Sequence, residues 1–193
     1  MLTRLKQWRD RRQKARFLYG SIVTQARCRD FYAHWGVPDT AEGRFEMIAL
    51  HLVLVLHRLA DTGDAGRRLG HALTEAFVAD LDDVLREMTV GDLAVPRHVK
   101  RAVAALHDRH ATYRAALTAA GDGPLIAAIQ ARLGGATKGL DTGQICGYIR
   151  HAKRRLDLLP GIEVLAGHVA WPQIDTLNVM GGRSRDDGGE HAR

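Results

Sequence analysis

The most prominent hydrophobic pattern in the chain is the run Phe45–Leu59, which is apolar on nearly every face of a helix. An ordinary strand has about 5 to 6 residues, so a run of this length favours a helix. A helix that is apolar all round must be buried by its neighbours. His51 interrupts the run, and His57 and Arg58 close it, well short of the roughly 20 apolar residues that cross a bilayer. We therefore predict a buried central helix over about 40–60.

The segments around this run carry apolar residues at three- and four-residue spacing, which predicts amphipathic helices that each bury one face. These helices are expected over 18–35, 69–88, 96–117, 125–133 and 145–159, with a last apolar piece over 164–171. No alternation of Val, Ile, Thr and aromatic residues repeats along the chain, so a sheet has little material. The prediction is an all-α, single-domain helical bundle around the central helix, with flexible termini.

Two helix starts carry the pattern of a capping box, in which two side chains satisfy free backbone N–H groups. Asp39 precedes Glu42 by three residues at the start of the central helix, and Asp141 precedes Gln144 in the same way. A loop is expected over 61–66, where Asp, Thr and Gly are concentrated.

The pattern divides the chain into three parts. Residues 1–16 form a basic N-terminal segment, residues 17–176 a helical domain, and residues 177–193 a tail rich in Gly, Arg and Asp. The tail has too few apolar residues to bury, so we expect it to be disordered.

The charge of the chain adds an expectation about partners. Its net charge is +6 and its pI is about 9.7, which favours an anionic partner, although many soluble proteins are simply basic. The N-terminal segment is the most basic part and includes an aromatic ring, a combination suited to an anionic membrane surface or to ribosomal RNA. The candidate contact residues are Trp8, Arg9, Arg11, Arg12, Lys14 and Arg16.

Motifs for catalysis are weak in this sequence. It has no phosphate-binding loop, no dinucleotide-binding glycine motif and no nucleophile elbow, and no Glu precedes a His by three residues as di-iron bundles require. His107 and His110 share a helix face, which leaves a haem or metal site as a minor alternative. We expect no catalytic residues, no cofactor and no metal.

Four stretches resemble the ubiquinol–cytochrome c chaperone family. They are Tyr19–Arg27, 31–40, Gly43–Leu56 and Leu85–Lys100, the last with the core Gly-Asp-Leu-Ala-Val-Pro. The resemblance implies an all-helical, non-enzymatic chaperone for assembly of the cytochrome bc1 complex, in a form typical of bacteria. Its expected client is newly made cytochrome b, held near the ribosome. Its expected location is the cytoplasm, peripheral to the inner membrane.

A client surface is expected around the connection near residues 91–96. Its candidate residues are Arg86, Asp92, Leu93, Val95, Arg97, Lys100 and Arg101. The alternative is a basic helical module that binds RNA or DNA, because the cations after Pro96 are placed to reach phosphates. This connection is longer than the turn of a helix-turn-helix, so we expect no specific DNA partner.

Overall fold

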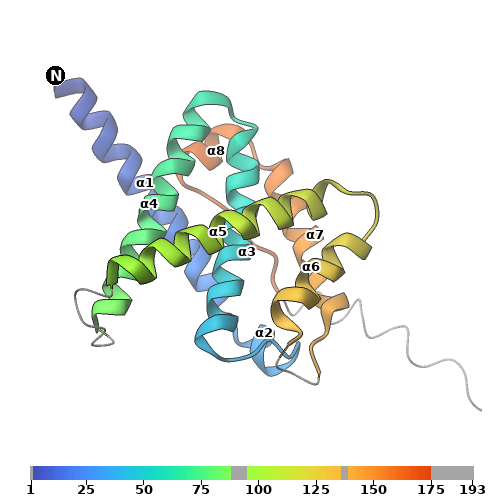
Figure 1. Ribbon diagram of the computed structural model, residues 1–193. Coiled ribbons are helices and arrows are strands. Elements are labelled where there is room, and N and C mark those ends of the chain that lie inside the picture. The colour runs from blue at the N-terminus through green and yellow to red at the C-terminus, as the bar shows by residue number, and fades with distance from the viewer. Residues whose placement is uncertain (1, 88–94, 136–138, 175–193) are drawn as a thin grey trace, which may run out of the picture.

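The computed structural model describes residues 2–87, 95–135 and 139–174, and every regular element within them is a helix (Figure 1). The all-α prediction is therefore confirmed. The elements are α1 (Leu2–Ala26), α2 (Arg29–Ala33), α3 (Ala41–Ala60), α4 (Gly63–Glu87), α5 (Val95–Thr118), α6 (Gly123–Leu133), α7 (Thr142–Leu158) and α8 (Gly161–Ala166).

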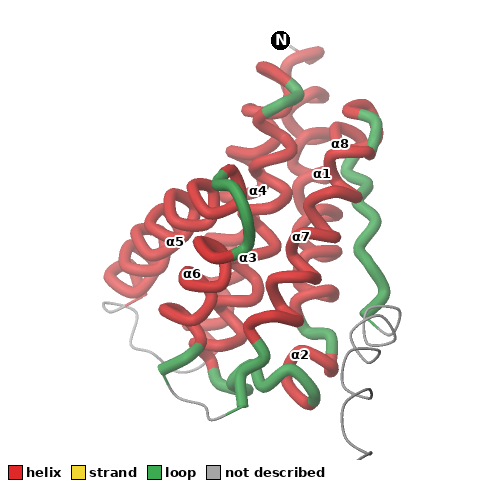
Figure 2. The backbone as a smooth tube through the Cα atoms, turned by 90° about the vertical axis from the view of Figure 1, so that its right-hand side faces the viewer, coloured by secondary structure: helices red, strands yellow, loops and turns green. Residues whose placement is uncertain are grey.

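Helix α3 lies at the centre of the bundle, as the apolar run predicts. It packs against α1, α4, α5, α6, α7 and α8, and Figures 1 and 2 both show it enclosed by other helices. Leu52 and Val55 are fully buried, and Ile48 packs against apolar residues on both sides of the helix.

Two apolar clusters meet on α3 and explain why nearly every face of it is apolar. Met47, Leu50 and Val53 belong to a cluster built mainly with α2, α5, α6 and α7. Leu52 and Val55 belong to a second cluster built with α1 and α4. Each buried Leu or Val contributes about 1.5–3 kcal/mol relative to exposure, so α3 is the main source of core stability.

The helix ends differ in part from the predicted ones. The N-cap of α3 is Thr40, whose hydroxyl accepts from the Gly43 N–H at 3.1 Å, and Asp39 instead pairs with Arg44. The Asp39 prediction is thus wrong by one residue, because both residues are good caps and only the chain path decides between them. The Asp141 cap of α7 is confirmed, and its carboxylate accepts from the Gln144 N–H.

The loop after α3 is shorter than the predicted 61–66, because α4 already begins at Gly63. Gly66 permits this early start. A Cβ at Gly66 would lie 2.0 Å from the Leu59 carbonyl oxygen, so only glycine lets the first turn of α4 lie this close to the end of α3.

Helix α1 is continuous across the predicted boundary at residue 16, so the basic segment and the first core residues share one helix. Its N-terminal half extends past the bundle, as Figure 1 shows. The segment after α8 runs back along α1. There the Trp171 Nε1–H donates to the Ser21 hydroxyl at 2.9 Å, and Gly167 lies against Lys14.

None of the described helices combines the length and the hydropathy needed to span a bilayer. The predicted tail over 177–193 lies outside the described residues.

Candidate functional site

A buried polar network joins α3 to α5. The Glu46 carboxylate is 1 % exposed, and it accepts from the Tyr113 hydroxyl at 2.6 Å and from the Arg109 Nε–H at 2.5 Å. Burial and the neighbouring Glu46 charge raise the pKa of Tyr113 far above its ordinary range. Tyr113 is therefore a neutral hydrogen-bond donor at all physiological pH values.

Arg109 lies on α5 with the exposed Arg97 and Arg101, yet its own side chain is mostly buried and packs over the Phe45 ring. The physical reason is Glu46, since a buried carboxylate requires a compensating cation. This network holds the bundle together and offers no open position for a substrate.

A second buried polar group, His51, lies in the middle of α3. Its Nδ1 lies 2.7 Å from the Met47 carbonyl oxygen, so Nδ1 carries the proton, and its Nε2 accepts from the Tyr148 hydroxyl at 2.7 Å. Burial lowers the pKa of His51 to about 4. His51 is thus a hydrogen-bonded histidine in the core.

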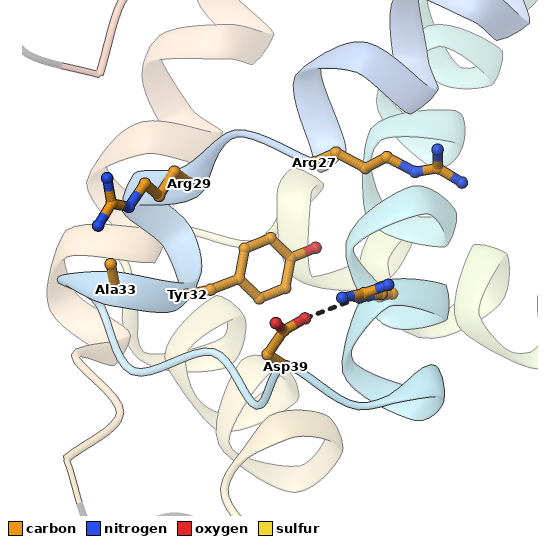
Figure 3. Close-up of a pocket in the computed structure, with 6 residues that line it drawn as sticks. Arg27, Arg29, Tyr32, Ala33 and Asp39 are labelled. Carbon is orange, nitrogen blue, oxygen red and sulfur yellow. Dashed lines mark hydrogen bonds and ion pairs between the residues drawn. The ribbon is translucent and has the colours of Figure 1, made fainter.

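A polar hollow of about 590 Å³ opens where α1, α2 and α3 meet (Figure 3). It is lined by Arg27, Arg29, Tyr32, Ala33, Asp39 and Arg44. Asp39 and Arg44 form an ion pair at 2.7 Å, and the Arg44 hydrogen bond lowers the pKa of Asp39.

The remaining cations of this hollow do not form a binding site for one small anion. The guanidinium groups of Arg27 and Arg29 point away from the Tyr32 ring in different directions, as Figure 3 shows. The Tyr32 hydroxyl is occupied, because it donates to the Ala26 carbonyl at 2.7 Å. The hollow is thus a positively charged surface feature without converging reactive groups.

A larger candidate is an elongated groove between α4 and α5, with the end of α3 along its base. Its first part has a volume of about 510 Å³ and is lined by Leu56, Leu59, Ala60, Gly66, Arg67, Gly70, His71, Thr74, Leu106, His107 and His110. It shares His71 and Thr74 with a second hollow of about 470 Å³, which Val78 and Val99 extend along the two helices. These two adjoining hollows are together called the α4–α5 groove, and their lining is mainly apolar.

Small residues at four-residue spacing build the α4 side of this groove: Gly66, Gly70, Thr74 and Val78. A Cβ at Gly70 would lie 3.2 Å from the Leu56 side chain, so glycine brings α4 close to α3 there. The small side chains leave space above them. Sequence reasoning did not identify this groove, although the four-residue spacing of small residues was a usable signal.

The two histidines of the metal alternative lie along this groove. His107 is exposed and His110 is half-buried, and burial followed by the nearby Arg114 charge lowers the pKa of His110. Within the described part of the chain, no three His, Cys, Asp or Glu side chains are placed to hold a metal ion. The pair therefore contributes polar edges to an apolar groove.

Only some of the predicted client residues can be placed. Arg97, Lys100 and Arg101 are exposed on the first turns of α5, next to Val99 at the end of the α4–α5 groove. Asp92 and Leu93 lie outside the described residues. Arg86 and Val95 lie in α4 and α5, and their side chains are outside the described part.

The predicted contact residues of α1 are largely open to solvent. Arg9, Arg12 and Arg16 are exposed, and Arg11 and Lys14 are half-buried. Trp8 is 42 % exposed, and Arg12 lies over its ring at 4.7 Å from the centroid. Lys14 is paired with Asp10 at 2.8 Å, which removes it from the free positive charge of this helix.

Comparison with known proteins gives the chain its family. The family model for the ubiquinol–cytochrome c chaperone matches residues 33–171. The crystal structure of the Cbp3 homologue from Brucella abortus superposes with a TM-score of 0.79 at 29 % identity, covering 91 % of this chain and 98 % of that one. No curated protein matches the chain. With most of its helical domain matched by the model, the chain belongs to the ubiquinol–cytochrome c chaperone family.

Proposed function

We propose that this protein is a non-enzymatic chaperone for assembly of the cytochrome bc1 complex, and that its client is newly made cytochrome b. The family match over residues 33–171 is the observation that carries this proposal. The geometry supports it, because the described residues present an apolar groove and buried structural networks rather than a cluster of reactive groups.

The α4–α5 groove is the proposed client site. A hydrophobic groove between two helices is a common docking place for a third helix. Thr74 lines both parts of the groove, and its small side chain leaves room for the close approach that small residues allow between transmembrane helices. The cations Arg97, Lys100 and Arg101 lie at one end of it and suit acidic or carbonyl-rich ends of a client segment.

The proposed location is the cytoplasm, with peripheral attachment to the inner membrane or the ribosome. The exposed arginines of α1 support this, because lipid headgroups and ribosomal RNA both present phosphates. The ring of Trp8 adds an apolar contact suited to the interfacial region.

Deletion of the gene tests the proposed function directly. We expect the assembled bc1 complex to fall to a small fraction of its normal level, measured by native gels and by the absorbance of b-type haem in membranes. Other respiratory complexes serve as the control and should keep their levels. An unchanged bc1 level would reject the proposal.

Filling the groove tests the proposed client site. Thr74→Trp adds a large side chain between α4 and α5 and so overpacks the groove. A cost of about 1.4 kcal/mol in the free energy of client binding corresponds to about a tenfold loss of affinity. We expect copurified cytochrome b to fall by about that factor. The matched control is Ala104→Trp, which adds the same ring at an exposed position of α5 and should capture cytochrome b normally.

A nucleic-acid-binding role is the second candidate, supported by the exposed cations of α1. It predicts binding of generic RNA that weakens steeply as salt increases, because each phosphate contact releases a counterion. A fluorescence anisotropy titration at several salt concentrations measures this slope. Absent or salt-independent binding would dismiss this candidate and leave the client proposal untouched.

A further inference from the structure

The corner between α7 and α8 carries the two most exposed large apolar side chains in the described part of the chain. Leu158 is 84 % exposed and Ile162 is 76 % exposed. They lie at the end of α7 and the start of α8, separated by a turn that contains Pro160. Single exposed leucines are ordinary, but a pair displayed at one corner marks a contact surface.

This corner is a firmly held part of the fold. Arg58 of α3 donates to the Leu156 and Leu159 carbonyl oxygens, both at 2.8 Å, and so fixes the end of α7. On either side of the turn, Leu156 and Val164 are buried in the two apolar clusters. The exposed side chains are therefore presented by a rigid turn anchored to the central helix.

Positive charge accompanies the apolar pair. Arg154 and Arg155 precede Leu158 by four and three residues, which places them on the same face of α7, and both are exposed. Of the acidic groups of the corner, Asp157 is compensated by Lys153, from which it accepts at 2.6 Å, and Glu163 contacts the His168 ring at 3.0 Å. The corner therefore presents two exposed apolar side chains together with two exposed arginines.

The corner also lies at the same end of the molecule as the projecting half of α1. Gly167, the C-cap of α8, packs against Lys14 of α1. At the other end of α8, a Cβ added to Gly161 would lie 3.3 Å from the Thr62 side chain. Figures 1 and 2 both show α8 on the side toward which the N-terminal half of α1 extends. The cations of α1 and of the corner are therefore available to one surface.

We propose that the α7–α8 corner, through Leu158 and Ile162 with Arg154 and Arg155, seats the protein on an anionic bilayer surface. The apolar pair enters the boundary between headgroups and acyl chains, and the arginines bind lipid phosphates. Charge complementarity supports an anionic bilayer as the partner, because the exposed Arg154 and Arg155 accompany the apolar pair and α8 lies on the side toward which the N-terminal half of α1 extends. This inference rests on the proposed function, which places the chaperone at a membrane.

Sedimentation of the full chain with lipid vesicles tests the proposal. The vesicles are made of phosphatidylcholine alone or of phosphatidylcholine with phosphatidylglycerol. We expect binding to the anionic vesicles only, and a loss of about tenfold or more for the double variant L158S/I162S, given the apolar area withdrawn from water. Both side chains are exposed, so thermal denaturation should show an unchanged fold.

A charge-matched pair of variants separates the corner from general basicity. R154A/R155A removes two exposed arginines from the corner, and R97A/R101A removes two from the first turns of α5. We expect the first to weaken binding severalfold and the second to leave it nearly unchanged. Wild-type protein that ignores anionic vesicles, or equal losses in both variants, would overturn the proposal.

Two further outcomes have defined meanings. If L158S/I162S changes the molar mass measured by light scattering and not vesicle binding, the corner joins two copies of the chain, and the proposal is rejected. If a variant that no longer binds vesicles restores the bc1 level in the deletion strain, the proposed role of the corner is rejected and the proposed function stands. If the protein binds anionic vesicles but deletion of its gene leaves the bc1 level unchanged, the proposed function is rejected and the proposed membrane contact stands.

Discussion

Glu46 and His51 of α3 are as buried as the leucines around them. Each is fully partnered: Glu46 binds Arg109 and Tyr113, and His51 binds the Met47 carbonyl and Tyr148. Such contacts add little net stability compared with apolar packing, but loss of one partner leaves an uncompensated polar group in the core. They therefore specify how α3 sits against α5 and α7.

The Glu46–Arg109 pair gives the largest single-residue prediction. Arg109→Met keeps most of the packing volume and leaves the buried Glu46 carboxylate without its cation. We expect the free energy of unfolding to fall by about 3 kcal/mol, measured by urea denaturation at neutral pH. Arg114→Met, on an exposed position of the same helix, should change stability by less than about 0.5 kcal/mol.

The double variant E46Q/R109M tests the reason for that loss. Removing both charges eliminates the buried uncompensated carboxylate, and an amide oxygen at position 46 can still accept from the Tyr113 hydroxyl, so stability should recover by more than half relative to Arg109→Met. A double variant that is no more stable than the single one would show that packing of Arg109, rather than its charge, is what matters.

His51 predicts a dependence of stability on pH. Its pKa is lowered to about 4 in the folded protein by burial, so between pH 6.5 and 4 the unfolded chain takes up a proton that the folded protein does not. Its contribution is fully present above pH 6.5 and is lost as pH falls toward 4. The loss amounts to about 3 kcal/mol at most.

The measurement is urea denaturation at pH 7, 6 and 5 for the wild type and for His51→Gln. The variant should show a weaker decline with acid, although His57 and His110, whose pKa values burial also lowers, keep part of it. His34→Gln is the control, because His34 is exposed, and it should retain the full decline. Equal slopes in all three proteins would contradict the assignment.

The presence of the helices with a long periodic pattern could be predicted from the sequence. The residues at which these helices begin and end could be predicted less well. The apolar run of α3 has only one physical solution in water, which is to be surrounded. Its start could not be fixed, because Asp39 and Thr40 both have capping side chains. The early start of α4 depends on Gly66 approaching Leu59, a tertiary contact that no local pattern contains.

The N-cap of α3 is tested by two neighbouring substitutions. Thr40→Ala removes the hydroxyl that accepts from the Gly43 N–H, and we expect a loss of about 1 kcal/mol in the free energy of unfolding. Asp39→Ala removes only an exposed ion pair with Arg44, and its effect should be much smaller than that of Thr40→Ala. The reverse order of the two effects would restore Asp39 as the cap.

The candidate site was only partly predictable. The exposed cations Arg97, Lys100 and Arg101 were assigned from composition, and the structure places them beside the α4–α5 groove. The groove itself arises from the way two consecutive helices, α4 and α5, pack over the end of α3, which no local pattern contains. The burial of Arg109 could not be predicted, because a helical wheel shows which face a residue is on and not which buried charge lies opposite it.

At the scale of the whole molecule, positive charge is concentrated outside the packed bundle. The stretch 2–17 has seven of the 28 Lys and Arg residues, most of them exposed, and the N-terminal half of α1 extends past the other helices. Charges placed there cost the fold almost nothing, since water solvates them in the folded and the unfolded chain alike.

Replacing Arg4, Arg9 and Arg16 by Gln tests this separation of charge from stability. Gln has nearly the helix propensity of Arg, so the free energy of unfolding should change by less than about 0.5 kcal/mol. Association with ribosomes or anionic vesicles should weaken, and its dependence on salt should become shallower. A large loss of stability would show that these arginines serve the fold instead.

The return of the chain along α1 also determines when the molecule is complete. Trp171 closes over His51 of the central helix and bonds Ser21, so one side of α3 is covered by nearly the last described residues. During synthesis, everything up to α7 leaves the ribosome before this cover exists. A nascent chain halted before Trp171 therefore displays part of the α3 surface that the finished protein hides.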